Sequence, residues 1–163
     1  MLSDSQDGRT LINEAAYAVI HEKAPNELIF YVDIRDRYLN DPEHFLAPPE
    51  AEDEPLAFGP GIPLDTISQV VFPILTPLLT LLVNEAIKAM GKDMGTEAIT
   101  WVRSLFNKTP PPVKPDFTQQ QLAAIMKACD AIAESEARRL NLKKSEVKMV
   151  RDALVARLGA GIG

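Results

Sequence analysis

Cysteine and histidine are scarce in this chain of 163 residues, which has one cysteine and two histidines. Cys129 alone cannot close an internal disulfide, and there is no cysteine pair with the spacing of metal ligands. His21 and His44 form no HExxH pattern, so we expect two surface histidines rather than a metal site. These shortages exclude disulfide scaffolds and sequence-local zinc sites.

Glycine-rich phosphate loops are lacking as well. The turn Gly59-Pro60-Gly61 and the stretch from Gly91 to Gly95 do not follow a strand pattern. Cys129 lies on the apolar face of an expected helix, where a small buried side chain is the usual role. Carboxylates are plentiful in the first third of the chain, so a paired acid–base site stays open, although no motif marks one. We therefore predict that the protein is not an enzyme, with no catalytic, cofactor-binding or metal-binding residues and no small-molecule substrate.

A basic and apolar leader is also missing. The first seven residues, from Met1 to Asp7, are polar and acidic, without the charged start and apolar core of a secretory signal. No lipidation motif occurs at either end. We therefore expect a cytoplasmic protein.

Negative charge is concentrated in the first part of the chain, although the net charge is only −6. Residues 1–65 carry a balance of −10, residues 66–113 of +1 and residues 114–163 of +3. Such polarity favours contact between the two ends, within one molecule or between copies. A solvated surface without such a contact is an equally good interpretation.

The most informative segment present is an uncharged run of nineteen residues from Thr66 to Asn84. Its apolar content predicts a central helix over 65–90, and Pro73 and Pro77 predict a kink or a break within it. A helix that is apolar all round is surrounded by other helices, or by a partner if its own chain cannot cover it. We expect partner or membrane contacts from seven of its residues: Val70, Phe72, Ile74, Leu75, Leu78, Leu79 and Leu82.

A membrane is the second candidate environment for this run. Nineteen helical residues span about 28 Å, close to the ~30 Å hydrocarbon thickness. Acids precede the run, and Lys88, Lys92 and Arg103 follow it, which would keep the C-terminal side cytoplasmic. Insertion can be constitutive, or conditional on release from a soluble core. Interspersed polar residues such as Gln69 and Thr76 favour the core helix instead.

The other periodic segments predict helices, so we expect an all-α bundle of about five or six helices around the central one. The first helix is capped at Asp7 or Thr10 and ends before Pro25. Residues 28–32 have strand propensity, but no second strand is available for pairing, so we favour a helix there. A further helix is expected over 96–106.

A helical hairpin is expected at the C-terminal end of the chain. Thr118 and Gln121 have the spacing of a capping box. Asn141 is placed to end the first helix of the hairpin, and the glycines from Gly159 onward are placed to end the second.

Two proline-rich segments define the expected domain organisation. Residues 47–63 hold five prolines and four acids, which predict an extended, partly docked loop within a helical domain of residues 1–108. Residues 109–116 hold four prolines and predict a semi-rigid linker to the C-terminal hairpin at 117–163. The linker contains Pro112-x-x-Pro115, a minimal ligand pattern for proline-reading domains that is common by chance.

Residues 136–158 partly resemble the helix–turn–helix segment of ribbon–helix–helix repressors. The likeness rests on the short turn and on Ser145-Glu146-Val147 at the start of the second helix. The chain departs from the family before the first helix, where Val113-Lys114-Pro115-Asp116 stands in place of the DNA-reading strand, and the first helix is too long. The acidic net charge makes nucleic acid the least favoured partner. The resemblance implies DNA binding as a further alternative, with phosphate contacts from Arg138, Arg139, Lys143, Lys144 and Lys148.

Over more of its length, the chain resembles a group of small, uncharacterised bacterial proteins. The likeness rests on Ala15-Ala16-Tyr17-Ala18-Val19-Ile20, on Leu56-Ala57-Phe58-Gly59 and on Arg139-Leu140-Asn141-Leu142. It implies a bacterial source and an all-helical fold, and it implies no activity. We therefore expect a non-catalytic interaction or assembly protein that binds copies of itself or a larger bacterial complex.

Overall fold

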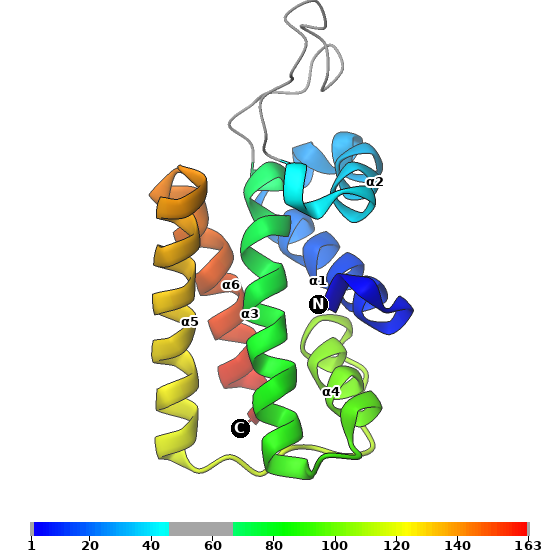
Figure 1. Ribbon diagram of the computed structural model, residues 1–163, viewed down its shortest axis with the longest axis vertical. Coiled ribbons are helices and arrows are strands. Elements are labelled where there is room, and N and C mark those ends of the chain that lie inside the picture. The colour runs from blue at the N-terminus through cyan, green and yellow to red at the C-terminus, as the bar shows by residue number, and fades with distance from the viewer. Residues whose placement is uncertain (1, 46–66, 163) are drawn as a thin grey trace, which may run out of the picture.

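The computed structural model describes residues 2–45 and 67–162, which form a bundle of helices (Figure 1). These two stretches contain six α-helices and no strand, which confirms the expected all-α fold. The predicted loop at 47–63 and the first two residues of the predicted central helix lie outside the described residues. In chain order the elements are η1 (Leu2–Asp4), α1 (Gln6–Lys23), η2 (Pro25–Phe30), α2 (Tyr31–Asn40), η3 (Pro42–His44), α3 (Ile67–Met90), α4 (Gly95–Asn107), α5 (Gln119–Leu140) and α6 (Lys144–Ile162), where η denotes a 3-10 helix.

Helix α3 runs through the centre of the bundle and contacts all five other α-helices (Figure 1). It continues without interruption through Pro73 and Pro77, so the helix break that the prolines suggested does not occur. Each proline removes one backbone donor, and the hydroxyls of Thr76 and Thr80 donate to the carbonyl oxygens of the residues four earlier, at 2.9 and 2.8 Å. Packing against the five other α-helices holds the helix where local propensity alone would interrupt it.

The start of α3 is capped by Glu27, which belongs to η2. Its carboxylate accepts hydrogen bonds from the backbone N–H groups of Ile67 at 3.3 Å and Ser68 at 2.8 Å, and from the Ser68 hydroxyl at 2.7 Å. Further along α3, the Tyr38 hydroxyl of α2 donates to Thr76 Oγ1 at 2.8 Å. Polar contacts therefore fix both the start and the middle of the central helix against η2 and α2.

Helix α1 begins earlier than predicted, because Ser5 caps it and neither Asp7 nor Thr10 does. The Ser5 hydroxyl accepts from the Gly8 N–H at 3.0 Å. η1 lies so close to this first turn that a Cβ on Gly8 would be 1.8 Å from the Leu2 carbonyl oxygen. After α1, residues 25–40 are helical, as a 3-10 turn followed by α2, which confirms the choice of helix over strand.

Helices α5 and α6 form the expected hairpin. The capping box is present, with Gln121 N–H donating to Thr118 Oγ1 at 3.0 Å and Thr118 N–H donating to Gln121 Oε1 at 2.8 Å. Asn141 ends α5 in the left-handed conformation, with φ of 54°. α6 continues to Ile162, so the glycines from Gly159 onward do not end it. Glycine weakens a helix by only about 1 kcal/mol, which does not forbid this continuation.

The hairpin is joined to α4 through residues that pack against the bundle. Lys108 ends α4 in the left-handed conformation, Pro115 is buried, and the Phe117 ring lies edge-on to Trp101 of α4, with 5.8 Å between centroids. Buried residues of the hairpin, among them Cys129 and Leu154, belong to the same apolar cluster as α3. The hairpin therefore completes the core of the bundle.

Candidate functional site

The seven residues of α3 expected to meet a partner or a membrane are core residues. Six of them are fully buried and Val70 is 5% exposed. Helix α3 is long and apolar enough to cross a membrane: its most apolar stretch of 18 residues has a mean hydropathy of 1.9. Within the bundle, 67% of this stretch is buried. In this conformation none of the seven reaches a partner or a membrane, because α1, α2, α4, α5 and α6 cover them.

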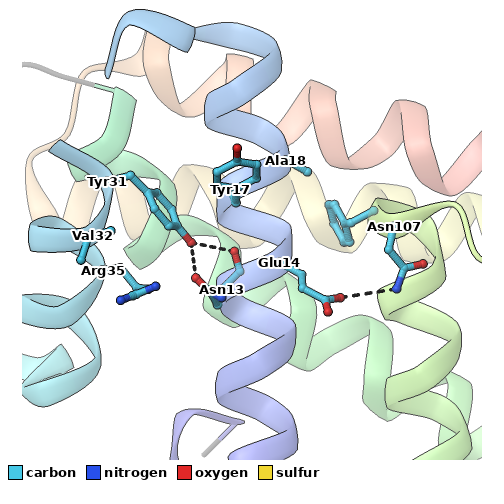
Figure 2. Close-up of a pocket in the computed structure, with 9 residues that line it drawn as sticks. Asn13, Glu14, Tyr17, Ala18, Tyr31, Val32, Arg35 and Asn107 are labelled. Atoms are coloured by element: carbon cyan, nitrogen blue, oxygen red, sulfur yellow. Dashed lines mark hydrogen bonds between the residues drawn. The ribbon is translucent and has the colours of Figure 1, made fainter. Parts of the chain in front are cut away.

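A groove of about 490 Å³ lies where α1, α2 and α4 meet, and we call it the aromatic groove (Figure 2). α1 and α2 supply most of its lining, and the C-terminal end of α4 closes one side. The residues that line it are Asn13, Glu14, Tyr17, Ala18, Tyr31, Val32, Arg35, Phe106 and Asn107.

The wall of the aromatic groove is held by Tyr31. Its hydroxyl donates to the Asn13 backbone carbonyl at 2.7 Å and also contacts Asn13 Oδ1 (Figure 2). Tyr17 lies edge-on to the Tyr31 ring at 5.4 Å, and the Arg35 guanidinium lies 5.8 Å from the centre of the same ring. Burial raises the pKa of Tyr31 well above its usual value, so the phenol stays protonated and keeps donating across the physiological range.

An ion pair fixes α1 to α4 beside the groove. Arg103 binds the Glu14 carboxylate through two nitrogens, at 2.6 and 3.1 Å. Figure 2 shows the further contact of Asn107 Nδ2 with the same carboxylate, at 3.5 Å. The hydrogen bonds to Glu14 raise the pKa of Arg103, which is consistent with a bidentate pair. These contacts hold α1 and α4 together at one side of the groove.

Apolar side chains project from this face into solvent. Among the described residues, the exposed large apolar side chains are Tyr17 at 48%, Val32 at 53% and Ile29 at 80%. Tyr17 and Val32 line the aromatic groove, and Ile29 lies three residues before Val32, at a spacing that places neighbours on one side of a helix. The apolar surface that the bundle leaves uncovered is thus gathered beside one groove.

A second groove, of about 580 Å³, lies between α5 and α6, and we call it the basic groove. It brings together three of the five cations suggested for nucleic-acid contact: Arg138, Lys144 and Lys148. Arg139 is not in the lining, and its guanidinium pairs with Glu136. Lys143 is exposed and is also outside the lining. Asp130, Ala133, Glu134, Ala137, Val147 and Arg151 complete the groove.

The residues with the greatest chemical reactivity do not converge on either groove. Burial raises the pKa of the Cys129 thiol to about 11, so it is protonated at neutral pH. His21 is exposed and stacks on Tyr17 at 6.0 Å, while His44 of η3 lies 3.0 Å from the Asp41 carboxylate. Within residues 2–45 and 67–162, no group of three or more His, Cys, Asp or Glu side chains is placed to hold a metal ion.

The sequence alone did not reveal the aromatic groove. Its lining comes from three separate elements. The only local signal was that Tyr31 and Val32 are adjacent, because a helix cannot direct two adjacent side chains fully toward the same core. The capping of α3 by Glu27 and the pair between Glu14 and Arg103 were also missed, because each joins residues at least 40 positions apart.

Comparisons with protein-family models, with curated proteins and with solved structures find no match to this chain. The class that the fold defines is therefore an all-α helical bundle with a central apolar helix, and function has to be argued from its surfaces.

Proposed function

We propose that this is a non-catalytic interaction protein that self-associates through the aromatic groove and its apolar rim. The observation that carries the proposal is the exposure of Tyr17, Ile29 and Val32, two of which line the aromatic groove, whereas the other large apolar side chains that the structure describes are buried or partly buried. Contiguous apolar surface beside a hollow is a common mark of protein contact sites. The cytoplasmic location and bacterial source remain predictions.

A second copy of the chain is the occupant that this surface favours. The same face offers a hollow lined by Tyr31 and Phe106 and, next to it, the projecting side chains of Ile29 and Val32. In a two-fold dimer a surface patch meets itself, so a patch with both a hollow and projections can complement itself. Because the core of one chain is already complete, we expect a dimer of folded monomers rather than an obligate, intertwined one.

The test is the mass of the protein in solution with and without Val32→Asp. We expect the unaltered chain to sediment as a dimer at about 1 M salt, where charge interactions are screened, and Val32→Asp to sediment as a folded monomer. Ala131→Asp, which places the same charge on an exposed position of α5, is the matched control and should stay dimeric. A compact monomer for the unaltered chain at high concentration and high salt would overturn the proposal.

A further inference from the structure

The basic groove carries an uneven distribution of charge. Arg138 lies in the last turn of α5, and Lys144 and Lys148 lie four residues apart in the first turns of α6, so the three cations gather near the turn of the hairpin. None of the three has an ion-pair partner among the residues that the structure describes. Deeper in the hairpin, Asp130 is paired with Arg151, so the positive charge that remains available is at the turn end.

The sequence contains one stretch whose charge is complementary to this end. Residues 50–54 read Glu50-Ala51-Glu52-Asp53-Glu54, with four carboxylates in five positions and no base nearby. Between residues 46 and 66 there are five acids and no lysine or arginine, so this segment holds five of the six net negative charges of the chain. Five extended residues reach about 16 Å, whereas Lys144 and Lys148 are about 6 Å apart along the helix. The stretch is long enough for its carboxylates to meet both lysines.

We infer that the basic groove is a docking site for the acidic stretch 50–54 of a second copy of this chain. The inference rests on the proposed self-association and adds a second, head-to-tail contact to it. A contact between two different surfaces of one protein is heterologous, so it can continue from copy to copy. The contact is electrostatic, and its strength should fall steeply with salt.

The groove suits a short acidic peptide better than a nucleic acid. Glu134 lines it one helical turn before Arg138, where a long polyanion following the hairpin would meet a negative charge. The chain as a whole carries a net charge of −6, which opposes the approach of a long polyanion more than that of a second copy, whose own net charge is only −6. A stretch with only four carboxylates in five positions can stop before Glu134.

The experiment uses two complementary variants of the full chain, both in a Val32→Asp background that removes the apolar contact. One has the groove reversed, by Lys144→Glu and Lys148→Glu, and keeps the acidic stretch. The other has the stretch reversed, by Glu52→Lys and Glu54→Lys, and keeps the groove. At about 0.05 M salt we expect each variant alone to sediment as a monomer. We expect an equimolar mixture to assemble into species that contain both variants, because the acidic stretch of the first meets the unaltered groove of the second and the two reversed surfaces also complement each other.

The control and the remaining outcomes make the result decisive. Lys114→Glu with Lys127→Glu reverses two exposed lysines outside the groove, and this variant should keep the low-salt assembly of the Val32→Asp chain. The groove reversal should weaken that assembly at least about tenfold, with an unchanged circular dichroism spectrum. A mixture that stays monomeric, as a contact within one chain would give, overturns the inference. A second outcome also overturns the inference: the mixture stays monomeric, and the chain binds a duplex oligonucleotide in a salt-dependent way that the groove reversal abolishes. Failure of the proposed dimer is seen in a separate measurement, in which the unaltered chain would sediment as a monomer at about 1 M salt.

Discussion

At the scale of single residues, Glu27 makes the most consequential long-range contact. Its carboxylate accepts hydrogen bonds from the first turn of α3, although it belongs to a different element. The first backbone donors of a helix need acceptors, and a negative charge at this end also interacts favourably with the helix dipole. This side chain therefore binds the first described turn of the central helix to η2.

We predict that Glu27→Ala lowers the free energy of unfolding by about 1–2 kcal/mol, because two backbone donors and the Ser68 hydroxyl lose their acceptor. Urea denaturation followed by far-ultraviolet circular dichroism measures this change. Glu27→Gln keeps one acceptor oxygen and should lose less. Glu43→Ala, at an exposed position in η3, is the matched control and should stay within about 0.5 kcal/mol of the unaltered chain.

Cys129 gives a pH-dependent prediction. Its folded-state pKa is about 11 against an ordinary 9.0, so between these values the unfolded chain releases a proton that the folded chain keeps. The contribution to stability is therefore complete below about pH 9 and is lost as the pH rises toward 11. Between about pH 9 and pH 11, the free energy of unfolding of the unaltered chain should fall by on the order of 3 kcal/mol more than that of Cys129→Ala. Urea denaturation at each pH measures both values. Equal losses in the two chains would contradict the assigned burial.

At the scale of elements, α3 shows where tertiary packing overrides local propensity. A proline in a helix interior costs about 3 kcal/mol relative to alanine. Pro73 and Pro77 leave the carbonyls of Gln69 and Pro73 without their usual helical donors, and the threonine hydroxyls bond to different carbonyls. The helix persists because most of its apolar residues are buried against the five other α-helices.

Pro77→Ala should therefore stabilise the protein. The restored donor and the removed ring clash favour the helix, while the looser unfolded chain offsets about 1 kcal/mol of the gain, which leaves about 2 kcal/mol. Thermal unfolding should show a higher melting temperature. Pro112→Ala is the control, at an exposed position of the 109–116 segment outside any helix. It should leave the melting temperature almost unchanged or slightly lower. A destabilised Pro77→Ala chain would mean that the packing of α3 depends on the ring itself.

The sequence was sufficient to predict most elements, and the reasons for its failures are physical. Periodicity predicted all the major helices, and the Thr118–Gln121 capping box and the Asn141 stop were confirmed because these signals are local. The cap of α1 was misplaced since Ser5 gains its role from the fold of η1, and the break in α3 did not occur because burial outweighs proline. Three cations of the candidate nucleic-acid set do share a groove, whereas the aromatic groove depends on three elements meeting in space.

At the scale of the whole molecule, the hairpin and the N-terminal helices share one core, so the proline-rich segment between them joins parts that support each other. We predict that a protease site replacing Pro110–Pro112 can be cut without separating the two pieces. The cut protein should elute at its original volume and keep its circular dichroism spectrum. Its melting temperature should be lower and should depend on protein concentration, because the two pieces are no longer held together by one continuous chain. Separation into a folded N-terminal piece and a free hairpin would instead support two independent domains.

Trp101 gives this bundle a built-in optical reporter. It is the only tryptophan in the sequence, it is 1% exposed on α4, and it contacts Phe117 at the entrance to α5. A buried indole emits at shorter wavelengths than one in water. Undocking of the hairpin would pull Phe117 away and wet the indole, so a red shift in emission would follow this single event without any label. Its time course after a jump in denaturant would give the rate at which the hairpin leaves the core.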